Sequence, residues 1–366
     1  MTDTIKKELL NQAQDLLSYL DTLTPQDSVL FTDKEVQAIL QDEHDKTQAN
    51  YDFALKKFME GNSDISFPKE KIFAVYWGYP GAGKSVMTQK IIDRFSQQED
   101  CLPFNIIDKD DHRDLFPNLF EHLKGGHIDE CEKFADVSIE YVRTILELSL
   151  HIGKRSVLSV GSMGAGSEFK DNALEALKYG YRPCAIYMAI NKDIAYLSNI
   201  YRSAMIYDQI IFQNKQLYPR LVSGEYFKRV VKMLPQMLDN IDCFQKENSQ
   251  RVDFMVINRN NKLLYHSNNP QNISVKEIIR NEEERPLQNE EVININMQLY
   301  KIRQNVQYRC ENDIYAPCKN EVEAMRVAVH HIYDLVSKKY NTKLYAHPQT
   351  YLISLPEARS SNSYAG

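Results

Sequence analysis

A run of eight residues carries the most specific chemical pattern in the sequence. Gly78-Tyr-Pro-Gly-Ala-Gly-Lys84-Ser85 fits the spacing GxxxxGK[ST] of a phosphate-binding loop. Glycines at these positions let successive backbone N–H groups curl around a phosphate, and the N-terminus of a following helix adds partial positive charge. Lys84 would reach the β- and γ-phosphates of a nucleotide, and Ser85 would offer its hydroxyl to Mg²⁺. The predicted nucleotide-binding residues are Gly78, Tyr79, Pro80, Gly81, Ala82, Gly83, Lys84 and Ser85, hereafter the P-loop.

A second set of reactive side chains follows the apolar run 103–107. Asp108, Asp110 and Asp111 come first, and Arg113 lies just beyond them. An aspartate at the end of a strand can orient and deprotonate an acceptor hydroxyl, or hold a water on Mg²⁺. Aspartate suits a helix N-cap equally well, so the residues alone leave both roles open.

Alternating strand and helix patterns surround these two groups. Short apolar runs predict strands at 71–77, 103–107, 156–160 and 184–190, with helices at 86–95, 134–152 and 170–178 between them. Such alternation predicts an α/β fold of the P-loop NTPase type, a doubly wound parallel sheet that binds ligands at the carboxyl ends of its strands. Two further runs, 252–258 and 262–267, predict a hairpin or an added edge strand.

Helical patterns occupy both ends of the chain. We expect a helical N-terminal extension over 1–64, a central domain over 65–285 and a helical C-terminal region over 286–366. Thr32 and Glu35 have the spacing of a capping box. One apolar stripe near the C-terminus has helical spacing. Its members are Val322, Met325, Val329, Ile332 and Val336.

Composition narrows the classes of partner. The 44 Lys and Arg residues stand against 50 Asp and Glu, a net charge of −6, so the basic footprint of a nucleic-acid-binding protein is missing. No apolar run approaches the ~20 residues of a membrane span, and the N-terminus lacks the apolar core of a Sec-type signal. The six cysteines form no CxxC pair, which favours reduced thiols. We therefore expect a cytoplasmic protein that binds neither nucleic acid nor membrane.

The type of P-loop protein follows from what accompanies the loop. A regulatory GTPase would carry a DxxG turn, and no glycine here has an aspartate three positions earlier. Asn191-Lys192-Asp193 differs from a guanine-reading NKxD because its aspartate comes one place too early. Residues 104–108, FNIID, match the apolar run and acid of a hydrolase only in part. A small kinase is the remaining class, and it needs the loop, a carboxylate and arginines.

Several stretches of the chain resemble the zeta toxin family of kinases. They are the P-loop, IDKDDHRDLFPN, AIYMAINKDIAYLSNIYR, YPRLVSGEYFKRVVKMLP and VINRNNKLLYHS, in the family's order over about residues 70–270. The resemblance implies transfer of the ATP γ-phosphate to a hydroxyl of the amino sugar of UDP-N-acetylglucosamine. It also implies that Lys84 binds phosphates, that Asp110 is the base, and that Arg202 and Arg220 stabilise charge on the transferred group. Two arginines between the fourth strand and the following helix are reasonable lid residues.

The sequence departs from this family on the sugar side. Where the family has Glu-Gly-Thr after the third strand, the chain has Val160-Gly161-Ser162, and Arg143 replaces a second acid. Arginine binds phosphate or carboxylate oxygens, so we predict a changed acceptor, such as another nucleotide-containing metabolite. The candidate substrate-binding residues are Asp108, Arg113, Arg143 and Ser162. The glycine cluster at 161–166 is either an anion-binding nest or a flexible turn.

These observations favour a kinase that uses Mg²⁺ and ATP or GTP and phosphorylates a small hydroxylated metabolite, acting as a toxin or effector. The altered sugar side leaves a non-catalytic, nucleotide-binding interaction protein as the alternative. A nucleic-acid end kinase would share the loop and aspartate but would need a basic channel. The resemblance further implies an antitoxin or other protein partner, for which the helical ends are candidate surfaces, and delivery into another cell.

Overall fold

A computed structural model describes most of the chain. It covers residues 3–25, parts of 32–56, and residues 70–98, 101–108, 143–161, 168–215, 217, 221–222, 224–269 and 273–339. The structural statements below concern these residues.

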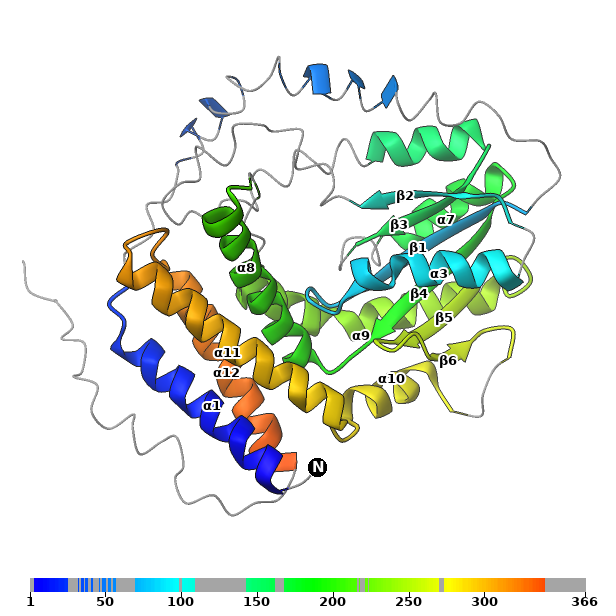
Figure 1. Ribbon diagram of the computed structural model, residues 1–366. Coiled ribbons are helices and arrows are strands. Elements are labelled where there is room, and N and C mark those ends of the chain that lie inside the picture. The colour runs from blue at the N-terminus through cyan, green and yellow to red at the C-terminus, as the bar shows by residue number, and fades with distance from the viewer. Residues whose placement is uncertain are drawn as a thin grey trace, which may run out of the picture.

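The centre of the fold is a six-stranded sheet with the order β2-β3-β1-β4-β5-β6 (Figure 1). The first five strands in this order are parallel, and β6 adds antiparallel to β5 at one edge. The strands are β1 (Ile72–Gly78), β2 (Phe104–Asp108), β3 (Ser156–Val160), β4 (Arg182–Ala189), β5 (Asp253–Asn258) and β6 (Leu263–His266). The parallel sheet and the β5–β6 hairpin confirm the predicted α/β fold.

Helices cover both faces of this sheet. All seven residues of β1 are buried, which requires cover on each face because successive side chains of a strand point to opposite faces. The helix α3 (Lys84–Gln98) packs on β1 at the front in Figure 1, and α7 (Phe169–Lys178) packs on β1 and β4 behind it. Two more helices, α9 (Gly224–Glu247) and α10 (Val275–Glu284), contact β5. Residues 143–152 are also helical, and the rest of the helix predicted for 134–152 lies outside the described residues.

Four helices form a separate layer beside the sheet (Figure 1). They are α1 (Asp3–Thr22), α8 (Lys192–Gln213), α11 (Asn289–Glu311) and α12 (Lys319–Lys339). Both terminal elements, α1 and α12, pack on each other, and α11 and α12 pack on α8. The predicted C-terminal stripe from Val322 to Val336 is buried in this layer. Residues distant in sequence thereby hold α8 in place.

A buried ion pair lies inside the helical layer. The Arg309 guanidinium donates to both carboxylate oxygens of Glu321 at 2.7 and 2.9 Å, and neither side chain is exposed. The same guanidinium stacks over the Tyr207 ring at 3.7 Å and donates to the Tyr315 carbonyl. These contacts join α11 to α8 and α12.

The remaining sequence predictions for the fold have mixed outcomes. The Thr32–Glu35 capping box is confirmed, because each residue's backbone N–H donates to the other's side chain. Five cysteines are free thiols, as expected, and Cys131 lies outside the described residues. None of the described helices has the length and apolarity needed to cross a membrane. The division at residues 64 and 285 stays a prediction.

Candidate functional site

The P-loop connects β1 to α3 at the carboxyl end of the sheet. Its backbone turns through two left-handed residues, Gly81 with φ +79° and Gly83 with φ +97°, a region that side chains other than glycine's rarely adopt. The Ala82 N–H donates to the Tyr79 carbonyl at 3.1 Å and closes the turn. The loop therefore has the strand–turn–helix context that its sequence pattern requires.

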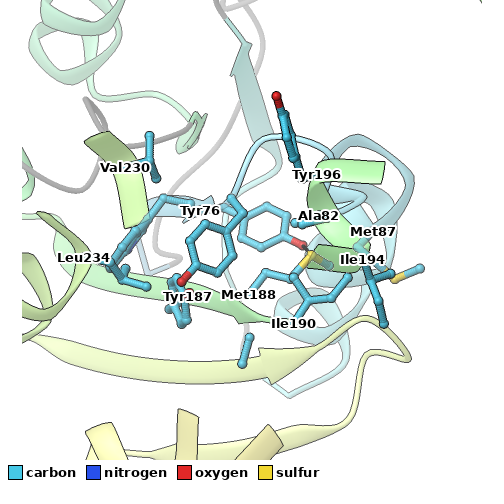
Figure 2. Close-up of a cluster of buried hydrophobic side chains, with 14 of the residues drawn as sticks. Tyr76, Ala82, Met87, Tyr187, Met188, Ile190, Ile194, Tyr196, Val230 and Leu234 are labelled. Carbon is cyan, nitrogen blue, oxygen red and sulfur yellow. Dashed lines mark hydrogen bonds between the residues drawn. The ribbon is translucent and has the colours of Figure 1, made fainter. Parts of the chain in front are cut away.

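Helix α8 supports the P-loop from one side. A Cβ built on Gly81 would lie 2.1 Å from the Ala195 carbonyl oxygen and 2.6 Å from the Asn199 nitrogen. Ala82 is fully buried and belongs to the same hydrophobic cluster as Met188 of β4 and Ile194 of α8 (Figure 2). The loop and the helix are thus in direct backbone contact.

The two polar side chains of the motif begin α3. Lys84 Nζ donates to the carbonyls of Gly78 at 3.1 Å and Tyr79 at 2.9 Å, so its ammonium lies over the P-loop itself. Ser85 follows at the exposed first turn of the helix, where its hydroxyl oxygen fits a hard cation such as Mg²⁺. Within the described residues no cluster of three or more His, Cys, Asp or Glu could hold a metal ion.

Arg202 belongs to α8 and lies near the P-loop. Its Nη2 donates to Asn199 Oδ1 at 3.2 Å, and Asn199 is the residue that contacts Gly81. The expectation that Arg202 lies between the fourth strand and the next helix is wrong. Asn191 caps α8 directly after β4 by accepting from the N–H groups of Asp193 and Ile194, so the helix has already begun ten residues before Arg202.

Of the acidic group Asp108, Asp110 and Asp111, the structure describes only Asp108. Asp108 ends β2 and pairs in register with Val160, which pairs with Tyr76 of β1. Because β3 lies between β2 and β1, Asp108 is two strand spacings, about 10 Å, from β1. It lies at the carboxyl edge of the sheet, where the P-loop begins. The other predicted site residues lie outside the described residues. They are Asp110, Arg113, Ser162 and Arg220, together with Asp111.

The sugar-side positions carry no carboxylate at the end of β3. The strand finishes with Ser159 and Val160, and the Gly161 N–H donates to the Tyr76 carbonyl at 3.0 Å. Arg143 forms an ion pair with Glu168 at 3.1 Å, in which both side chains are about half exposed. Glu168 directly precedes α7, so the arginine joins the helix at 143–152 to the segment after the second glycine cluster.

A polar cluster joins Tyr79 of the P-loop to Tyr187 of β4 and Glu283 of α10, with both tyrosines buried and the glutamate partly buried. The Tyr187 hydroxyl donates to Glu283 Oε1 at 3.2 Å, and Tyr79 is hydrogen-bonded to both. Burial raises the pKa of the Glu283 carboxyl to about 7, against opposing hydrogen bonds from the two tyrosines. Asn191 Nδ2 also donates to the Glu283 backbone carbonyl, so the cluster ties α10 to the P-loop and to the cap of α8. No sequence pattern predicted this contact.

Arg259 is a second residue that sequence reasoning missed. It follows β5, in the turn to β6, and its Nε lies 3.6 Å from a Cβ built on Gly83. The signal available in the sequence was a cation directly after a buried strand, on the sheet edge where parallel strands place ligands.

The central strand of this parallel sheet leads through the glycine loop into a helix that begins with lysine and serine. This arrangement defines the P-loop kinase fold. The sequence profile named Zeta toxin matches residues 62–270. The chain belongs to the zeta toxin family.

One solved structure supports this fold, and a second aligns more weakly. A chain from the PezAT chromosomal toxin–antitoxin system of Streptococcus pneumoniae is similar at 16% identity and a TM-score of 0.52, over 70% of this chain and 97% of that one. A chain of the AvrRxo1-ORF1:-ORF2 complex aligns at 10% identity and a TM-score of 0.40, over 82% of this chain and 89% of that one. No curated protein sequence matched the chain. At such identities the structural likeness concerns the fold alone.

Proposed function

We propose that the protein is a Mg²⁺-dependent kinase that transfers the γ-phosphate of ATP or GTP to a hydroxyl of a small metabolite. The observation that carries the proposal is the junction of the P-loop with α8. Gly81 of the P-loop contacts the Asn199 backbone, and the Asn199 side chain accepts a hydrogen bond from Arg202, which supports a site to which both the loop lysine and a helix arginine contribute. Two cations at one end of a parallel sheet suit a transferring phosphoryl group.

The proposed reaction divides its work among this chain's residues. The acceptor hydroxyl attacks the γ-phosphorus while the bond to the bridging β,γ-oxygen breaks, and the nucleoside diphosphate leaves. Asp110 accepts the hydroxyl proton, and Lys84, Arg202 and Arg220 stabilise the charge on the phosphoryl oxygens. A bound Mg²⁺, held by Ser85, would neutralise charge on the β- and γ-phosphates.

The acceptor we propose is a nucleotide sugar or another nucleotide-containing compound. The end of β3 offers Ser159 and Val160 in place of an acid, which removes the carboxylate that would bind sugar hydroxyls. Arg143 on the neighbouring helix, whose guanidinium pairs with the half-exposed Glu168, is the candidate cation, with Asp108, Arg113 and Ser162 as further candidate contacts. A cation in place of an acid favours an acceptor that carries phosphate or carboxylate groups.

ATP consumption tests the activity. Wild-type protein with Mg²⁺ and a metabolite mixture should consume ATP, whereas Lys84→Ala and Asp110→Ala should both be inactive. Lys178→Ala is the matched control, because that lysine is exposed on α7 and pairs with Glu175 one turn earlier. Turnover that survives in Lys84→Ala would refute the assignment of the P-loop.

The biological role we propose is that of a toxin or effector with a protein partner. Membership of the zeta toxin family supports the role, and the similar chain from Streptococcus pneumoniae comes from a toxin–antitoxin system. A nucleotide-binding interaction protein is the second candidate, favoured by the missing acid at the end of β3. ATP binding by the wild type without turnover would favour this second candidate.

A further inference from the structure

Arg259 is a cation at the rim of the P-loop. A Cβ built on Gly83 would be in van der Waals contact with its Nε at 3.6 Å. Gly83 is the glycine directly before Lys84, and its peptide leads into the N-terminus of α3. The guanidinium therefore lies beside the backbone N–H groups that bind phosphate in this motif.

The turn that carries Arg259 is held in one conformation. Asn258 Oδ1 accepts from the backbone N–H groups of Asn260 and Lys262, both at 3.0 Å. Asn261 adopts a left-handed φ of +60°, and its carbonyl accepts from Arg94 Nη2 of α3 at 2.6 Å. This contact ties the β5–β6 turn to the helix that follows the P-loop, so the position of Arg259 relative to the loop is fixed.

Arg259 has little to satisfy its charge within the described part of the chain. Its hydrogen bond there joins Nη1 to Ser198 Oγ at 3.5 Å, and that hydroxyl also exchanges hydrogen bonds with Gln298. The carboxylate that acts on it electrostatically, Glu291, is occupied by a bidentate pair with Arg285. Burial lowers the pKa of the Arg259 guanidinium.

A partly buried guanidinium without a paired carboxylate is costly unless an anion binds it. The functional site provides such an anion when a nucleotide is bound, because the phosphates of a P-loop ligand lie over the loop glycines. The order of the strands shows on which side of the P-loop Arg259 lies. Asp108 ends β2 on one side of β1, whereas Arg259 follows β5 on the other side. Arg259 is therefore on the side of the P-loop opposite to Asp108, the side on which the acceptor is proposed to bind.

We propose that Arg259 is a phosphate-binding residue of the nucleotide site and contacts the phosphate chain at its nucleoside end, the α-phosphate. The inference rests on the proposed nucleotide binding and adds a residue that the P-loop motif does not contain. An arginine can donate two hydrogen bonds to one phosphate, which a lysine cannot do with the same geometry.

Calorimetric titration with ADP and with inorganic tripolyphosphate tests the proposal. The proteins are wild type, Arg259→Ala, Arg259→Lys and, as matched control, Arg251→Ala, whose exposed side chain precedes the same strand. Arg259→Ala should weaken binding of both ligands by about 10- to 100-fold, the range of a charge-assisted hydrogen bond. The affinity of Arg259→Lys should lie between those of Arg259→Ala and wild type, and the affinity of Arg251→Ala should equal that of wild type.

Thermal unfolding without ligand separates binding from folding. Removal of a poorly paired, partly buried cation should leave the Tm of ligand-free Arg259→Ala equal to that of wild type or higher. Unchanged affinities for both ligands would overturn the proposal. Weakened ADP binding with normal tripolyphosphate binding would also overturn it, since the guanidinium would then act on the nucleoside. A lowered ligand-free Tm large enough to account for the lost affinity would overturn it as well. Wild type that binds neither ligand would instead refute the proposed function itself, and this inference with it.

Discussion

The contact between Gly81 and α8 yields a quantitative prediction about two glycines of the same loop. Both Gly81 and Gly83 have left-handed backbones, so alanine at either position costs about 1–2 kcal/mol in conformational strain. Their surroundings differ. A Cβ on Gly81 would be 2.1 Å from a carbonyl oxygen of α8, whereas among the described residues a Cβ on Gly83 would meet Arg259 Nε alone, at 3.6 Å.

The steric cost therefore falls on Gly81 alone. To reach an ordinary contact, the P-loop and α8 must separate by more than about 1 Å. Overpacking of this kind costs about 1–3 kcal/mol, which brings Gly81→Ala to about 2–5 kcal/mol and leaves Gly83→Ala at about 1–2 kcal/mol. For a chain of 366 residues, a difference of about 2 kcal/mol corresponds to a Tm difference of about 3 °C.

Thermal unfolding of the two variants without ligand measures this difference directly. We expect Gly81→Ala to unfold at the lower temperature. Equal Tm values, or a lower Tm for Gly83→Ala, would show that α8 does not support the P-loop as the structure has it.

Three further predictions concern other parts of the structure. Glu283 binds its proton more tightly when folded, with a pKa of about 7 against an ordinary 4.5, so its contribution to stability falls as pH rises from about 4.5 to 7. In denaturant titrations, the free energy of unfolding of Glu283→Gln minus that of wild type should rise by up to about 3 kcal/mol between pH 5 and pH 8. A difference that does not change with pH would contradict the raised pKa of Glu283. Arg309→Met should destabilise the protein by about 3–5 kcal/mol by leaving Glu321 buried and unpaired, and Arg309→Met/Glu321→Leu should recover much of the loss in the same titrations. Lys84→Ala should keep the ligand-free Tm within about 2 °C of wild type but lose the increase in Tm caused by ADP, and a retained increase would argue against the P-loop site.

Patterns that depend on local chemistry were predictable from the sequence. The third strand occurs at the predicted residues 156–160, because a run of apolar residues between polar turns defines it without reference to its neighbours. The P-loop was predictable for the same reason, since its glycine spacing encodes one backbone shape. Helix α3 begins two residues earlier than predicted, at Lys84, because the loop itself forms the helix N-terminus.

Contacts between distant elements were not predictable. The support that Asn199 gives to Gly81 joins residues about 120 positions apart, and only the packing of α8 against the P-loop reveals it. Arg259 belongs to a stretch that resembles the family, but the sequence of that stretch does not show that the β5–β6 turn lies beside the P-loop. The same holds for Glu283, whose acidic neighbours in sequence are typical of a solvated helix end.

The central claim is phosphoryl transfer from a nucleotide to a metabolite hydroxyl. The most direct test is to incubate the protein with ATP labelled in its γ-phosphate, Mg²⁺ and a panel of nucleotide-containing metabolites, and to identify the products by mass and fragmentation. We expect one metabolite to gain the labelled phosphoryl group on a hydroxyl, with no product from Lys84→Ala or Asp110→Ala. Label that appears only as inorganic phosphate, or a metabolite product that Lys84→Ala also makes, would contradict the account.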